Sequence, residues 1–416
     1  MQRKTAIAIV SIVIVLVVGG LLAFYFYANR GQSGGAAPIS GGTGIFPSGS
    51  SGGQGSAVPP APSGGTAPAG IPGAPAPVLK ELSQRPSAGA VAFATSSTSA
   101  ILVNFVERGT GNVYEVSPDT SVETRLSNTT IPKIQEALWA GDGNQLIVRY
   151  VKDGESDTIE SYYAKLAAPA AGQSEGSLAG SFLTENISQA ITNPEQNELF
   201  YLVTDPGGST GIISQIDGTK KIQVFASPLR EWLAQWPAAN TIALTTKPSA
   251  AVPGFMFLLN TQSGALTRAI SNITGLTTLV SPDAQTTLYS QNDNNGGFAL
   301  KVYSFKTGQS EDLAVTTLPE KCVWSRLNTA IVYCAVPSYI PNAAYPDAWY
   351  QGTVSFSDDI WRIDTGTGAG KLLAKLSNLA RQDIDGVNLF MDTGEHYLFF
   401  TNKNNYHLWS LRLNNQ

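Results

Sequence analysis

An all-β fold made of repeated four-stranded units is predicted by three observations on the sequence. Two β-rich runs separated by a short polar turn recur at intervals of about 40 to 60 residues. In most units a second strand–turn–strand stretch follows, and helical periodicity is nowhere sustained from residue 79 onward. Four-stranded units of this length are typical of β-propellers, so the sequence predicts a seven-bladed β-propeller over residues 79–416.

The first 30 residues predict a membrane anchor. Thr5–Ala28 is a run of 24 residues without a charge, long enough as a helix to cross a hydrocarbon core of ~30 Å. Arg3 and Lys4 precede it, which favours a cytoplasmic N-terminus and an extracytoplasmic remainder. A cleaved signal peptide is the alternative, but its apolar run is usually shorter. We therefore expect residues 1–30 to form a single-pass transmembrane helix in the cell membrane.

Residues 31–78 predict a flexible, disordered linker. Of these 48 residues, 38 are Gly, Ser, Pro or Ala and none is charged, so the segment cannot bury enough apolar surface to offset the entropy of ordering it. The globular part that follows carries 23 Lys and Arg against 31 Asp and Glu, a formal charge of −8. An acidic domain without a basic cluster argues against a nucleic-acid partner.

The bounds of the propeller units are predicted from their hairpins. The stretch EALWAGDGNQLIVRY from Glu136 is one example, and Trp139, Trp236 and Trp324 stand at matching positions just before the turn. Bulky rings at that position are expected to fill the space between neighbouring sheets. The predicted units are 85–127, 128–186, 187–227, 228–271, 272–315, 316–377 and 378–416.

The last unit supplies only three strands of its own. The segment VLKELS (Val78–Ser83) matches the exit strand KLLAKLS (Lys371–Ser377) of the preceding unit. We therefore expect the N-terminal strand to complete the last blade, which closes the ring and removes open sheet edges there.

Two turns carry a resemblance to a known family. VSPDAQTTLYS from Val280 is similar to the strand, Ser-Pro-Asp-Gly turn and strand of TolB-type, WD-related propeller repeats, with Ala284 where the glycine usually stands. DIWRIDTGTG from Asp359 resembles the same family's strand and Asp-x-x-x-Gly turn. The resemblance implies a propeller that acts as an envelope scaffold or as the non-catalytic part of a peptidase. It carries over no catalytic residue.

Cys322 and Cys334 are the only cysteines, and both fall in unit six on strands joined by a turn near Asn328. Outside the cytoplasm a disulfide between them is reasonable if their Cβ atoms come close enough. Two buried thiols are the alternative.

Several motifs that suggest chemistry are interpreted as structural. Ser209 lies in a literal G-x-S-x-G, but between β-rich runs rather than on a strand-to-helix turn. His396 and His407 lie in strands of the last unit, and Asp383 and Asp385 are too few ligands for a metal site. We therefore expect no catalytic residue, no metal site and no cofactor.

The insertion in unit six, between its second and third strands, is the candidate binding segment. Rigid aromatic side chains on a loop suit recognition of a peptide or a sugar. The alternative is that they fold back and pack on neighbouring blades. The candidate residues are Tyr339, Tyr345, Trp349, Tyr350 and Phe356.

Together these observations predict a membrane-tethered extracytoplasmic module that binds or scaffolds an envelope protein or peptide. A carbohydrate-binding module is one alternative and would present Trp349 and Tyr350 as exposed rings. An extracytoplasmic hydrolase or lyase with its site in the propeller channel is the other, because fold alone does not decide function.

Overall fold

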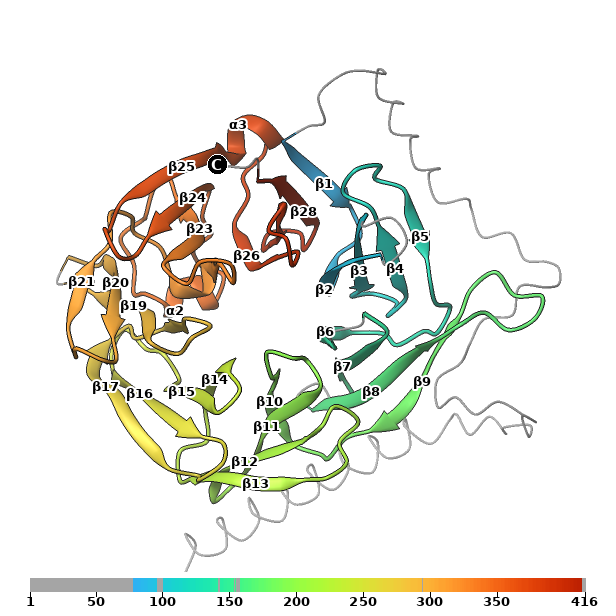
Figure 1. Ribbon diagram of the computed structural model, residues 1–416, viewed down its shortest axis with the longest axis horizontal. Coiled ribbons are helices and arrows are strands. Elements are labelled where there is room, and N and C mark those ends of the chain that lie inside the picture. Colours follow the sequence, from blue (N-terminus) through green and yellow to red (C-terminus); the bar gives the residue numbers. More distant parts are fainter. Residues whose placement is uncertain are drawn as a thin grey trace, which may run out of the picture. The chain divides into compact units, whose positions relative to one another are not determined.

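The computed structural model describes residues 78–95, 100–140, 143–152, 154, 158–293 and 295–413. These residues form seven four-stranded antiparallel sheets arranged as blades around a ring (Figure 1). The prediction of a seven-bladed β-propeller is confirmed. The predicted anchor over residues 1–30 and nearly all of the predicted linker over residues 31–78 lie outside the described residues.

The strands follow one another from the centre of the ring to its rim within each blade (Figure 1). The first four blades comprise β2 (Ser87–Ala94), β3 (Ile101–Glu107), β4 (Val113–Val116) and β5 (Glu123–Arg125); β6 (Ile134–Trp139), β7 (Gln145–Val151), β8 (Ile159–Ala167) and β9 (Ser177–Phe182); β10 (Ile187–Thr192), β11 (Glu198–Asp205), β12 (Gly208–Gln215) and β13 (Ile222–Ser227); and β14 (Trp232–Ala238), β15 (Thr241–Thr246), β16 (Pro253–Asn260) and β17 (Leu266–Thr274).

The remaining blades comprise β18 (Thr278–Val280), β19 (Thr286–Asn292), β20 (Phe298–Ser304) and β21 (Ser310–Asp312); β22 (Cys322–Trp324), β23 (Ile331–Pro337), β24 (Asp358–Asp364) and β25 (Gly370–Lys375); and β26 (Gly386–Met391), β27 (Tyr397–Asn402) and β28 (Leu408–Arg412) with β1 (Leu79–Ser83). Each predicted unit contains the strands of one blade, except that β17 runs to Thr274, three residues past the predicted end of the fourth unit. The hairpin pattern is therefore sufficient to place the blade boundaries.

Strand β1 closes the ring in the way the sequence predicts. It pairs antiparallel with β28, with Leu79 opposite Leu411 and Glu81 opposite Trp409. Blade seven is thus built from both ends of the domain, and Leu82 of β1 is buried against residues of blades one and seven. The start of β1 and the end of β28 lie at the same end of this sheet, since the two strands are antiparallel neighbours.

The hydrophobic core lies between adjacent blades. One cluster joins Val106 and Val113 of blade one to Leu146 and Val148 of blade two. The predicted tryptophans take part in such contacts and are all buried. Trp139 Nε1 donates to the carbonyl of Gly89 in the preceding blade at 3.1 Å, which ties neighbouring sheets together.

The turn that carries the family resemblance shows why a residue other than glycine is tolerated there. Ala284 has a φ of 52°, in the left-handed region that favours glycine. Its N–H donates to the Ser281 carbonyl at 2.9 Å, and Asp283 Oδ1 accepts from the Gln285 N–H at 3.1 Å. These bonds hold the turn in the glycine-type conformation despite the added Cβ.

Helices are short and few among the described residues. They are the 3-10 helix η1 (Pro319–Lys321), α2 (Asp347–Tyr350) and α3 (Leu376–Ala380). No helix in the described ranges, which begin at Val78, is long and apolar enough to cross a membrane.

Candidate binding surface

The insertion of blade six, residues 338–357, connects β23 to β24, the second and third strands, as predicted. It contacts the equivalent loops of blades four and five, so the three loops share one face of the ring. Ala250 N–H donates to Asp347 Oδ2 at 2.6 Å, and Asn292 Nδ2 donates to the Tyr345 carbonyl at 2.7 Å. We call residues 247–252, 293, 295–297 and 338–357 together the loop platform.

Three of the five predicted recognition aromatics are buried beneath this platform. Tyr345 is 1 % exposed, Trp349 4 % and Phe356 2 %, and they pack with Phe298 and Leu318 in one apolar cluster. The expectation that these three rings present a recognition surface is therefore wrong, and so is the exposed Trp349 required of a stacking carbohydrate site. The reason is that a 20-residue loop needs a core of its own, and its large rings supply that core.

The other two predicted aromatics remain at the surface. Tyr339 is 73 % exposed and Tyr350 42 %, and Val252 on the neighbouring loop is 63 % exposed. Tyr350 Oη also donates to Glu320 Oε1, which orients its ring. The surface available for recognition is thus smaller than predicted and centres on Tyr339, Tyr350 and Val252.

A buried charged group lies under the platform, where blades six and seven meet. Lys321, the last residue of η1, has no exposed side-chain surface. Its Nζ lies 2.8 Å from Asp358 Oδ2, contacts Asp385 Oδ1 and donates to the Gly386 carbonyl at 3.0 Å. One ammonium therefore faces two buried carboxylates contributed by β24 and by the segment just before β26.

Asp385 connects this charged group to the insertion. Its Oδ2 accepts from Trp349 Nε1 at 2.9 Å, from the Phe356 N–H at 3.1 Å and from Ser355 Oγ at 3.2 Å. Lys403 of the β27–β28 turn donates to the Trp349 carbonyl at 2.8 Å and lies 4.9 Å from the ring centroid. The insertion is held from below by blade seven and from the side by blades four and five.

Burial dominates the electrostatics of the group. It raises the pKa of Asp358 to about 6, with Lys321 opposing the shift and Asp385 adding to it. Burial also raises the pKa of Glu320 and lowers the pKa of Lys403. Loss of water around the carboxylate, which Lys321 offsets only in part, explains why Asp358 binds a proton more readily than an exposed aspartate.

Sequence reasoning did not find this group. Lys321 and Asp385 are 64 residues apart and meet only because blades six and seven are neighbours. From the sequence, Asp385 is interpreted only as a structural residue, with too few neighbouring ligands for a metal site. The sequence does indicate a buried charge at each position, because both residues directly precede an apolar innermost strand. A charged side chain there is buried and needs a partner of opposite charge.

The remaining predicted positions have structural surroundings. Cys322 and Cys334 lie opposite each other on β22 and β23, and their Sγ atoms are 2.12 Å apart in a disulfide bond. Ser209 lies within β12, and its Oγ donates to the Leu229 carbonyl at 2.7 Å. His396 Nδ1 is 2.9 Å from Asp392 Oδ2, and His407 Nδ1 is 2.6 Å from Glu81 Oε1.

The innermost strands line cavities around the centre of the ring. One of about 480 Å³ is walled by Ala90–Ala92 of blade one and Leu389–Met391 of blade seven, with Glu195, Arg326 and Asp392 at its edge. Neither histidine lines it, and the described residues contain no group of three or more His, Cys, Asp or Glu side chains placed to hold a metal ion. A hydrolase or lyase with its site in this channel stays a prediction.

Comparisons with known proteins find similarity to this chain in fold. No protein-family model matches the sequence, and no curated protein matches it. Among solved structures, an oligogalacturonate lyase in complex with manganese is similar over 79 % of this chain and 99 % of its own, at 11 % identity and a TM-score of 0.50. TolB from Acinetobacter baumannii is similar over 68 % of this chain and 63 % of its own (12 % identity, TM-score 0.42).

The β-propeller domain of the Trilobed protease from Pyrococcus furiosus is similar over 77 % of this chain and 93 % of its own, at 12 % identity and a TM-score of 0.48. At such identities the likeness concerns the fold and carries no activity from one protein to another. The sheet topology shows that the chain is a seven-bladed β-propeller of four-stranded blades, and TolB is one of the solved structures to which it is similar.

Proposed function

We propose that this protein is a membrane-tethered, extracytoplasmic binding or scaffolding module whose loop platform recognises a protein or peptide of the cell envelope. The observation that carries the proposal is the way the platform is fixed. The insertion hydrogen-bonds to the loop of blade four and to the loop of blade five, and its core is anchored to the buried Asp385.

A fixed platform favours binding because little order has to be imposed on the loops when the partner arrives. Its exposed side chains include the aromatic or apolar Tyr339, Tyr350 and Val252. Polar side chains such as Lys247, Asn342 and Gln351 are exposed around them. Tyrosine combines a large contact area with a hydroxyl group and has few rotatable bonds, and it is enriched where proteins bind one another. The platform therefore has the composition of a small recognition surface.

Two features support the proposed extracytoplasmic location of the propeller. The uncharged run Thr5–Ala28 with Arg3 and Lys4 before it has the length and charge bias of an anchor that leaves the rest of the chain outside. The Cys322–Cys334 disulfide is a bond that persists in oxidising compartments.

Photocrosslinking tests the proposed function. A photoreactive phenylalanine analogue at Tyr339 in the full chain, irradiated in intact envelopes, is expected to give a discrete cross-linked protein. The matched control is the same analogue at Val122, which is 65 % exposed on the β4–β5 turn of blade one.

Comparison of positions 339 and 122 distinguishes a protein partner of the platform from non-specific contact and from a glycan ligand. A product at position 339 that is absent at position 122, and that Tyr350→Ala weakens, supports a protein partner. Identical products at both positions would contradict the platform as the recognition surface. Retention of an envelope polysaccharide that is lost in Tyr339→Ala, without a protein product, would point instead to a glycan.

A further inference from the structure

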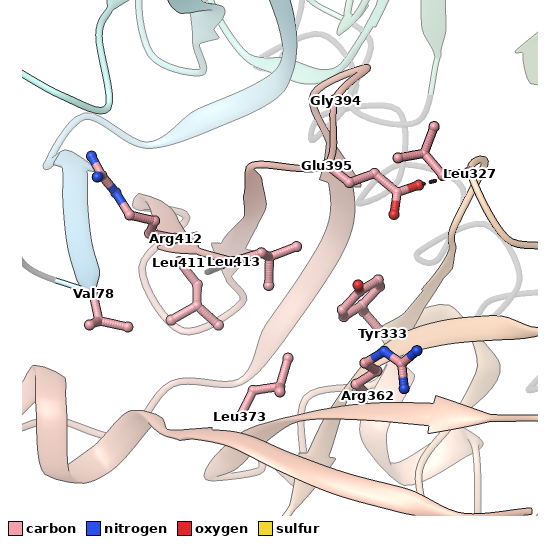
Figure 2. A pocket seen from close by; sticks show the side chains of 10 residues that line it. All are labelled: Val78, Leu327, Tyr333, Arg362, Leu373, Gly394, Glu395, Leu411, Arg412 and Leu413. Carbon is pink, nitrogen blue, oxygen red and sulfur yellow. Dashed lines mark hydrogen bonds between the residues drawn. The ribbon is translucent and has the colours of Figure 1, made fainter. Parts of the chain in front are cut away.

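A pocket lies at the seam between blades six and seven, at the end of the sheet where the described chain begins and ends (Figure 2). Its volume is about 360 Å³. Figure 2 shows blade-six side chains facing blade-seven side chains across it. Five of its ten lining residues are apolar: Val78, Leu327, Leu373, Leu411 and Leu413. Arg362, Glu395 and Arg412 add charged groups to the wall.

The pocket exists because blade seven lacks one turn. In blade six the third and fourth strands are joined by a turn whose first residue, Thr365, donates its N–H to the Ala330 carbonyl at 2.8 Å. In blade seven Leu413 makes the equivalent bond to the His396 carbonyl at 2.8 Å, but no turn links β28 to β1. The end of β28 and the start of β1 lie where the other blades have a hairpin turn.

The pocket leaves apolar surface in contact with water. Leu327 is 69 % exposed and Val78 43 %. Tyr333 adds an aromatic ring to the wall, and its hydroxyl group interacts with Arg362. Proline-rich segments in polyproline conformation dock into grooves lined by aromatic side chains, and Tyr333 supplies one such ring here.

We propose that this pocket binds the chain's own segment IPGAPAP, residues 71–77, which directly precedes Val78. The segment is continuous with a residue of the pocket wall, so it needs no partner to reach the site. It carries no charge, and its side chains, which are apolar or absent, match the five apolar residues of the wall.

The sequence of the segment also fits the groove conformationally. Ile71, Ala74 and Ala76 each precede a proline, and the residue before a proline is driven away from the helical region toward extended or polyproline conformations. Seven residues in polyproline geometry reach about 20 Å, enough to cross the pocket from Val78. Because the contact is intramolecular, its effective concentration is of millimolar order, and a weak affinity suffices.

Disulfide trapping in the full-length protein tests the proposal. The two native cysteines are bonded to each other, so Ile71→Cys and Leu327→Cys introduce the one additional pair. Under mild oxidation, docking predicts rapid formation of an intramolecular disulfide between them. A second pair, Ile71→Cys with Leu373→Cys, repeats the measurement if the first variant folds poorly.

The control keeps the length of the segment and removes its prolines. Replacing Pro72, Pro75 and Pro77 by serine in the same cysteine pair is expected to slow trapping about tenfold, the factor that corresponds to ~1.4 kcal/mol. Equal trapping rates with prolines and with serines would overturn the proposal, because chance encounter would then explain the bond. A disulfide between two chains would overturn it as well, since the occupant would be a second copy.

Discussion

Trp349→Ala should destabilise the propeller strongly, although the residue lies in a loop insertion. The ring is 4 % exposed, stacks 6.4 Å from Phe356 and donates to Asp385 Oδ2 at 2.9 Å. Truncation removes the ring contacts and leaves a buried carboxylate with one donor fewer. Buried tryptophan-to-alanine changes cost about 3–5 kcal/mol, a range we expect to hold here.

Urea and thermal unfolding of the propeller fragment 78–416 measure the effect. An unfolding entropy of ~2 cal/mol/K per residue makes each kcal/mol about 1.5 °C of Tm in a domain of this size, so the expected decrease is about 5–7 °C. Tyr339→Ala is the matched control on the same insertion, and at 73 % exposure it should change stability by no more than ~0.5 kcal/mol. A loss below ~1 kcal/mol for Trp349→Ala would refute the conclusion that the insertion has a core fixed to blade seven.

Three further changes test other parts of the structure. Deleting residues 78–83 removes the outer strand of blade seven and its pairing with β28, so a large decrease in Tm is expected, and an unchanged melt would disprove the strand closure. Burial raises the pKa of Asp358 to about 6, so folding takes up a proton at this carboxylate. The free energy of unfolding, measured with urea, should therefore be about 1 kcal/mol larger at pH 5 than at pH 7. This difference should disappear as the pH rises through 6. Asp358→Asn should remove that increment, and an identical pH profile in the variant would contradict the assignment. Replacing both cysteines of the disulfide, which closes a loop of 12 residues, by serine should cost about 2–3 kcal/mol, and wild-type protein treated with reductant should then melt like the variant.

The fold could be predicted because every blade repeats the same local signals. Each hairpin contains its own turn residues, such as those around Ala284, and its own alternating β-rich runs. Apart from β1 with β28, every pair of strands in a blade is consecutive in the sequence. The closing strand was also predictable, because VLKELS repeats the pattern of an exit strand found in the preceding unit.

The binding surface could be predicted only in its location. An insertion rich in aromatic residues is visible in the sequence, but the same composition serves recognition and burial equally well. The inward position of Trp349 depends on two residues of blade seven. Asp385 accepts a hydrogen bond from the Trp349 ring, and Lys403 donates one to the Trp349 carbonyl. Such contacts between blades have no local signature, so the outward position of Tyr339 and the inward position of Trp349 emerge only from the three-dimensional structure.

The closing strand also makes the two faces of the ring different, because the chain enters the domain on one of them. Strand β1 starts at the end of blade seven opposite to the β27–β28 turn, whose Lys403 contacts the insertion. A chain that reaches the domain at Val78 thus arrives on the side away from Tyr339 and Tyr350. The entry point of the chain and the two tyrosines therefore lie on opposite faces of the ring.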